Sequence, residues 1–111
     1  MIIQIFGTKK CKDTKKAERF FKERKIQIQM VDLAQKALSK GEMNRIAQAV
    51  GLDNMIDPTS KRYEDLGLKY MKFDLQEKLL EEPLILKTPI VRLQQKATLG
   101  YQPEVWKEWL K

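Results

Sequence analysis

The sequence predicts an α/β fold in which a mixed β-sheet carries an inserted block of short helices. Three observations support this prediction: a strand–helix–strand pattern opens the chain, helical patterns fill its middle, and strands followed by a helix close it. The chain has 111 residues, of which 42% are hydrophobic, and this is enough to build one core. We therefore expect residues 1–111 to form a single domain.

The opening pattern places two strands around an amphipathic helix. The run from Ile2 to Phe6 is rich in isoleucine and ends at Gly7, which is typical of a buried strand. From Lys12 to Arg24 the pattern is helical, and the apolar residues on one face are Ala17, Phe20 and Phe21. Apolar residues alternate with glutamines from Ile26 to Met30, which predicts a second strand. Such an opening predicts a parallel pair joined by a right-handed crossover.

The middle of the chain predicts three helices. Ser39 followed by Glu42 has the spacing of a capping box, and apolar residues then recur at helical spacing as far as Val50. Gly51 stands where a helix-ending glycine belongs. Two shorter helical patterns follow, from Arg62 to Leu66 before Gly67 and from Leu75 to Leu80 before Pro83.

The last third predicts strands and a helix. Leu84 to Leu86 is expected to be a third strand, which Ile90 to Leu93 continues or restarts. After the polar turn 94–96, residues 97–99 are expected to pair back as a hairpin. Pro103 opens a final helix, whose apolar stripe is expected in the core: Val105, Trp106, Trp109 and Leu110. This order of elements is thioredoxin-like, with extra helices inserted in the middle.

A single cysteine and the absence of histidine restrict the chemistry. One cysteine cannot form an internal disulfide, so a disulfide-stapled secreted fold is excluded. A histidine-based catalytic triad is impossible. A structural zinc site is not expected, so no residue is assigned to a metal. Any chemistry must use the thiol, the carboxylates or the basic residues.

The net charge of +7 favours anionic partners, namely nucleic acid, an acidic protein surface or a small oxyanion. The alternative is an ordinary solvated basic surface. No helix-turn-helix, zinc-finger or RNP-like pattern is present, so direct nucleic-acid binding is not expected. No apolar run is long enough to span a bilayer, and the N-terminus lacks the features of a signal peptide. We therefore expect a cytoplasmic protein without membrane contact.

Cys11 falls at the predicted turn from the first strand into the first helix. A helix N-terminus presents unpaired N–H groups and a partial positive charge, and both favour thiolate over thiol. Lysines on both sides, at positions 9, 10 and 12, add positive charge. Thr14, three residues further on, is placed to donate its hydroxyl to the sulfur. These features predict a nucleophilic cysteine, and the alternative is a small buried filler.

The chain has no second cysteine to resolve an oxidised Cys11. Glutathione or a separate glutaredoxin- or thioredoxin-type dithiol protein would therefore have to act as reductant. The predicted mechanism is monothiol: attack by the cysteine, an adduct at its sulfur, and release by an external thiol. No cofactor is expected other than glutathione as a co-substrate.

Four stretches of the sequence carry a resemblance to a known family: IFGTKKCKDTKKA, SKRYEDLGLKY, PLILKTPIVRL and LGYQPEVWKEWL. Together they resemble the glutaredoxin-linked arsenate reductase family (ArsC), which also contains the Spx transcription regulators. The resemblance implies a thioredoxin-like, glutaredoxin-type fold with a central helical insertion. It also implies that the catalytic cysteine is Cys11 and that the Thr88–Pro89 bond is cis, with Pro89 shaping the groove beside the sulfur. On the sequence alone, a trans proline at a strand edge is the alternative.

The arginines that hold the oxyanion in the reductases of this family are replaced here. Thr88 and Thr59 align with two of them, and Gln102 lies near the third. Nearby basic residues could substitute in part, but lysine lacks the bidentate fork of arginine. They are Lys61, Arg62, Lys87 and Arg92. The predicted function is therefore a thiol-dependent oxidoreductase in which arsenate reduction itself is not expected. The predicted substrate-binding residues are Lys10, Lys12, Thr59, Lys87, Thr88 and Pro89.

The Spx branch supplies the alternative function. Its members bind the C-terminal domain of the RNA polymerase α subunit, and their redox switch is commonly a Cys-x-x-Cys pair. Thr14 stands here in place of the second cysteine, so that switch is absent, and the chain lacks their longer tail. Gly51 lies near a glycine that contributes to the polymerase contact in that branch. A simple helix-ending role also explains Gly51.

Overall fold

The computed structural model describes residues 1–111 and contains one four-stranded mixed sheet with the strand order β2-β1-β3-β4. The strands are β1 (Ile2–Gly7), β2 (Gln27–Asp32), β3 (Ile90–Leu93) and β4 (Lys96–Leu99). β1 pairs with β2 in parallel and with β3 in antiparallel orientation, and β3 and β4 form an antiparallel hairpin. The predicted parallel opening and closing hairpin are therefore both confirmed.

Two helices cover one face of this sheet, α1 (Lys12–Glu23) and α5 (Pro103–Trp109). Between them and the strands lies a cluster of buried side chains: Ile3, Ile5, Ala17, Phe20, Phe21, Val91 and Trp106. The indole Nε1 of Trp106 donates a 2.8 Å hydrogen bond to Thr98 Oγ1, so its polar group is satisfied inside the core. The prediction for Val105 was wrong, because this side chain is 38% exposed while Trp106 fills the space beside it.

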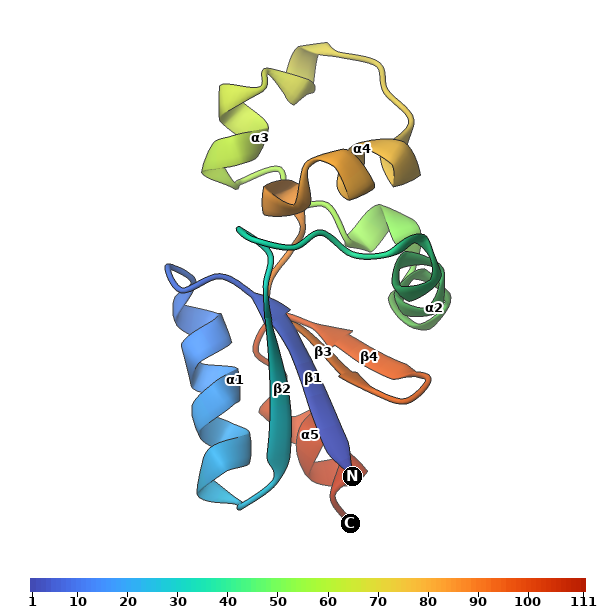
Figure 1. Ribbon diagram of the computed structural model, residues 1–111. Coiled ribbons are helices and arrows are strands. Elements are labelled where there is room, and N and C mark those ends of the chain that lie inside the picture. Colours follow the sequence, from blue (N-terminus) through green and yellow to red (C-terminus); the bar gives the residue numbers. More distant parts are fainter.

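A helical block covers part of the opposite face and stands beyond the carboxyl end of β1 (Figure 1). Its helices are α2 (Lys40–Val50), α3 (Lys61–Asp65) and α4 (Leu75–Glu81), joined by short 3₁₀ turns at Leu52–Asn54, Leu68–Tyr70 and Pro83–Ile85. The capping box at the start of α2 is confirmed, since Ser39 Oγ accepts from the Glu42 N–H and the Glu42 carboxylate accepts from the Ser39 N–H. Phe6 and Ile90 connect the sheet to the apolar interior of the block.

Glycine ends two of the block's helices, as predicted. Gly51 follows α2 with φ +89°, and Gly67 follows α3 with φ +65°. Both values lie in the region that residues with a Cβ rarely adopt. The position of Gly51 at the end of α2 therefore explains why a glycine stands there.

The predicted strand over 84–86 was wrong. Pro83 begins a 3₁₀ turn, and only Leu86 makes an isolated antiparallel bridge, with Ile56. The next residue, Lys87, donates its N–H to the Met55 carbonyl at 2.7 Å. Ile85 and Leu86 are buried in the interior of the helical block. A short apolar run of this kind resembles a buried strand in the sequence, although this segment has no strand beside it in the sheet. None of the helices has the length and apolar character needed to cross a membrane.

Candidate active site

Cys11 lies at the N-cap position of α1, in the connection that leaves the carboxyl end of β1. Its backbone is extended, with φ −81° and ψ 115°, and its N–H donates to the Thr8 carbonyl at 3.2 Å. No side chain caps this helix, in contrast to α2. The first N–H groups of α1 therefore remain available to the sulfur. The side chain is partly exposed, so the predicted position of the thiol is confirmed.

Thr88 faces Cys11 from the segment that leads into β3. Its hydroxyl donates to Sγ at 3.2 Å, and the thiol lies 3.8 Å from the Thr88 carbonyl oxygen. The two residues meet because β1 and β3 are neighbours and Phe6 is paired with Ile90. The Thr88–Pro89 peptide bond is cis, as the family resemblance implied. Pro89 itself is buried.

Thr14 lies on the first turn of α1 and is almost completely buried. Its Oγ1 has no hydrogen-bond partner in the structure. The side chain packs directly against Gly7, where an added Cβ would collide with Thr14 Oγ1. A glycine at the end of β1 is therefore needed for this close approach. The result is an unused buried hydroxyl beside the cysteine.

The pKa of the Cys11 thiol is lowered by its surroundings. Partial burial alone would raise this pKa, because it disfavours the charged thiolate. Donors around the sulfur outweigh burial. The Thr14 hydroxyl, which has no partner beside the neutral thiol, is available to the thiolate and lowers the pKa, and the Thr88 hydroxyl, which already donates to Sγ, lowers it as well. The backbone N–H groups of Thr14 and Asp13 act in the same direction. The site therefore favours the nucleophilic thiolate.

A cleft of about 860 Å³ opens at Cys11 between the sheet and the helical block. Among the residues lining it are Thr8, Lys10 and Thr88, together with Pro83 and Leu84 from the block side. Of the predicted substrate-binding residues, the cleft thus contains Lys10 and Thr88. The others do not line it: Lys12, Thr59, Lys87 and Pro89. Thr59 instead donates its hydroxyl to Asp57 at 2.6 Å.

The single arginine that lines the cleft, Arg62, is already engaged. Its guanidinium forms a forked pair with the Glu82 carboxylate, with N–O distances of 2.7 to 3.2 Å. Arg92, also considered as a substitute, lies on the sheet and donates to Gln4 and to the Gln94 carbonyl. Lys9, Lys10 and Lys61 are the other cations of the cleft. An incoming oxyanion therefore meets point charges and no free guanidinium.

Sequence reasoning missed the acidic side of this cleft, which contains Asp32, Asp57 and Asp65. A signal for Asp32 was present, because it ends the strand that runs parallel to β1. The carboxyl ends of parallel strands meet at the same sheet edge, where ligands bind in α/β folds. Asp57 and Asp65 come from the block, and no sequence pattern indicated their approach. No group of three or more potential metal ligands is gathered anywhere in the structure.

A parallel strand–helix–strand unit, an antiparallel hairpin and a helix-capping cysteine opposite a cis-proline define a thioredoxin-like protein. The solved glutaredoxin 1 of Archaeoglobus fulgidus shares this fold at 15% identity and a TM-score of 0.50, covering 98% of this chain and 85% of that one. Within this class, the chain belongs to the ArsC family, whose model matches residues 6–109.

Relatives of both kinds anticipated by the resemblance are found. The global transcriptional regulator Spx 2 of Oceanobacillus iheyensis is 28% identical over 99% of this chain and 84% of its own length. The solved arsenate reductase of Vibrio cholerae is 23% identical, with a TM-score of 0.81 over 97% of each chain. The names of these two relatives describe transcriptional regulation and arsenate reduction, and each activity is that of the relative.

Proposed function

We propose that this protein is a monothiol redox protein in which Cys11 is the nucleophile and an external thiol is the reductant. The observation that carries the proposal is the Cys11 sulfur at the uncapped start of α1, with the Thr88 hydroxyl 3.2 Å away and a lowered pKa. Thr14 supports the thiolate with its otherwise unpaired hydroxyl. Lys10 attracts anionic substrates to the cleft.

The proposed reaction is thiol–disulfide exchange. The Cys11 thiolate attacks one sulfur of a disulfide, that S–S bond breaks, and the other sulfur leaves as a thiolate. The mixed disulfide at Cys11 is then attacked by a second external thiolate, which returns Cys11 to its thiolate form and releases a new disulfide. Glutathione or a glutaredoxin- or thioredoxin-type protein supplies that thiol. This cycle suits the cytoplasm, where glutathione keeps a single cysteine reduced.

Arsenate reduction is not part of this proposal. The reaction requires strong stabilisation of a charged oxyanion, and the cleft offers lysines while Arg62 is paired with Glu82. The test is mass spectrometry of the protein incubated first with glutathione disulfide and then with glutathione. We expect one glutathione adduct on Cys11 that the reduced thiol removes, and no adduct on Cys11→Ser. With arsenate, glutathione and glutaredoxin, we expect no arsenite, and rapid arsenite formation would contradict the proposal.

A second candidate function is transcriptional regulation through the C-terminal domain of the RNA polymerase α subunit. It is favoured by the match to a global transcriptional regulator over 99% of this chain. The test is direct binding of that domain to the wild-type protein and to Cys11→Ser. Binding by both proteins would support a regulator that needs no thiol, and no binding at micromolar concentration in low salt would exclude this role.

A further inference from the structure

The outer edge of β2 is an unprotected sheet edge. β2 has β1 as its only neighbour, and its six residues, QIQMVD, contain no proline, lysine or arginine. Its pairing with β1 is continuous from Gln27 to Asp32, so no bulge interrupts it. Natural sheet edges usually carry a proline, a charged side chain such as lysine, or a bulge, because each of these hinders the addition of another strand. The opposite edge strand, β4, is shorter, begins with Lys96 and contacts α2.

The backbone of β2 offers hydrogen-bonding groups to the outside. The Leu33 N–H donates to the Gly7 carbonyl at 2.9 Å, so odd-numbered residues here face β1. In a parallel ladder alternate residues point to opposite sides, and the N–H and C=O groups of Ile28 and Met30 therefore point away from β1. No turn or loop of the chain bonds to these groups. They form a short free ladder for an added strand.

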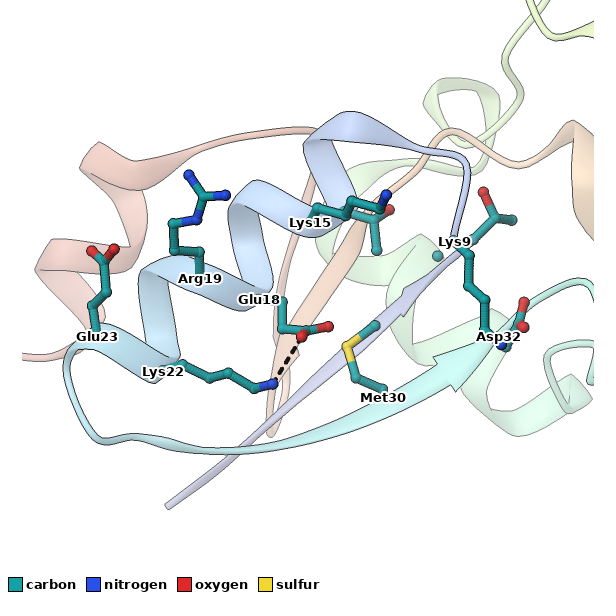
Figure 2. Close-up of a pocket in the computed structure, with 11 residues that line it drawn as sticks. Lys9, Lys15, Glu18, Arg19, Lys22, Glu23, Met30 and Asp32 are labelled. Atoms are coloured by element: carbon teal, nitrogen blue, oxygen red, sulfur yellow. Dashed lines mark hydrogen bonds and ion pairs between the residues drawn. The ribbon is translucent and has the colours of Figure 1, made fainter.

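A groove of about 630 Å³ runs along this edge, between α1 and β2 (Figure 2). Met30 is the one hydrophobic residue that lines it, and its side chain is 42% exposed. Met30 pairs with Ile5, whose side chain is in the core beneath α1, so both point to the α1 face of the sheet. A strand added to β2 would place alternate side chains over Met30 and against α1.

The α1 wall of the groove is basic. Residues 1–25 contain nine lysines and arginines and three acidic residues, a net charge of +6 out of the +7 of the chain. Lys15 and Arg19 line the groove and form no ion pair. Lys9 is a third unpaired cation of the groove. Of the acidic residues there, Glu18 is paired with Lys22 at 2.8 Å, while Glu23 and Asp32 keep their charge, so three unpaired cations stand against two unpaired carboxylates. The unpaired cations therefore favour a partner with carboxylate side chains.

The same charge disfavours a second copy of this chain as the occupant. Antiparallel pairing of two β2 edges would place both α1 helices on one face of the joined sheet. Two segments of charge +6 would then lie side by side and repel each other. The occupant that fits is a different protein segment, extended and acidic.

We propose that the β2 edge binds an extended acidic peptide segment of a partner protein by strand addition. The bonds come from the backbone of Ile28 and Met30, and the charge complementarity comes from Lys15 and Arg19. This surface goes beyond the thiol chemistry, since it needs no reaction at Cys11. Its groove shares Thr8, Lys9 and Asp32 with the cysteine cleft, so one end of the docked segment lies beside Cys11.

The test uses capped octapeptides with alternating valine and glutamate, measured by fluorescence anisotropy against the full chain. We expect micromolar binding, at least tenfold weaker binding when the glutamates are replaced by lysines, and loss of binding when alternate peptide nitrogens are methylated. Equal binding of the methylated peptide would overturn strand addition. Tighter binding of single-stranded oligonucleotides than of the acidic peptide would show a nucleic-acid surface and also overturn the proposal.

Variants of the protein locate the site. Met30→Pro removes an outward N–H without breaking the β1–β2 ladder, so we expect at least tenfold weaker binding, while the matched control Met30→Thr retains binding within about threefold. Lys15→Gln with Arg19→Gln should also weaken binding, unlike Lys69→Gln with Lys72→Gln on the block. Cys11→Ser should bind as the wild type, which separates this surface from the redox proposal. Thermal unfolding checks that Met30→Pro is folded, and if it is not, the methylated peptide on the wild-type protein decides.

Discussion

Two threonine hydroxyls surround the Cys11 sulfur, and they act from different elements. Thr88 lies in the segment before β3 and already donates to Sγ, whereas Thr14 lies on α1 with an unpaired, buried Oγ1. A buried hydroxyl without a partner costs free energy, which a hydrogen bond to a thiolate would recover. The thiolate is therefore the form of Cys11 that this arrangement fits.

Removing either hydroxyl should raise the pKa of Cys11. We expect Thr88→Val and Thr14→Val each to shift the midpoint of the alkylation rate against pH upward, because each loses a donor to the thiolate. Thr14→Val should leave the free energy of unfolding at neutral pH within about 1 kcal/mol of the wild type, since it removes an unpaired group. Thr59→Val is the matched control, because Thr59 does not line the cleft and its hydroxyl donates to Asp57, and its midpoint should not move.

The lowered pKa of Cys11 makes stability depend on pH. Because the folded protein loses this proton at lower pH than the unfolded chain does, folding gains stability as the pH rises. The gain is complete above the unfolded pKa, about 8.5, and is lost as the pH falls through the lowered folded pKa. Relative to Cys11→Ser, the wild type should therefore become more stable in urea titrations from neutral pH to about pH 9. A flat difference would mean that folding leaves the pKa unchanged.

At the scale of the elements, α1 and α2 begin in opposite ways. α2 begins with a full capping box at Ser39, so side chains satisfy its first N–H groups. α1 begins at Cys11 without a side-chain cap, and backbone N–H groups of its first turn lower the thiol pKa instead. The start of α2 is thus built for stability, and the start of α1 is left open for the sulfur.

The cap of α2 should carry a measurable share of stability. We expect Ser39→Ala to lower the free energy of unfolding by about 1 kcal/mol, because the N–H of Glu42 loses its acceptor. Ser39→Asp keeps an acceptor and should stay near the wild type. Chemical denaturation measures both, and an unchanged stability of Ser39→Ala would show that water replaces the cap without cost.

The elements with strong local signals were predicted correctly, whereas the segment 84–86, whose surroundings are set by distant contacts, was not. The α1 face, the Ser39 cap and the glycine ends of α2 and α3 follow from short spacings along the chain. The segment 84–86 failed because its apolar residues enter the helical block, which spacing alone cannot distinguish from a strand. Cys11 was located by its position before a helix, but its contact with Thr88 spans 77 residues of sequence, and only the family resemblance brought Thr88 and Pro89 to the site.

At the scale of the whole molecule, the positive charge is concentrated beside the reactive cysteine. The first 25 residues carry +6 of the net +7, and they include the Cys11 loop and all of α1. The helical block, residues 40–87, carries a net charge of −1, with eight basic and nine acidic residues, and the hairpin 90–99 carries +2. Such a field accelerates the approach of anions to the side of the molecule that carries α1 and Cys11. Salt should weaken this effect, because exposed charges are screened.

The reaction of Cys11 with an anionic disulfide should therefore depend on salt. We expect the rate constant with 5,5′-dithiobis(2-nitrobenzoate) to fall several-fold between roughly 20 and 500 mM salt. Neutral 2,2′-dithiodipyridine is the matched probe, and its rate constant should change little. Stopped-flow absorbance follows both reactions. Equal salt dependence of the two probes would show that the charge of residues 1–25 does not act at the sulfur.

The pH dependence of Cys11 alkylation by iodoacetamide is the most direct test of a thiolate-stabilising site. The rate constant, followed by mass spectrometry of the folded wild-type protein, should rise with a midpoint clearly below about 8.5, the value of a free cysteine. The urea-unfolded chain supplies the internal reference and should titrate near that value. A midpoint of the folded protein at or above the reference would contradict the account.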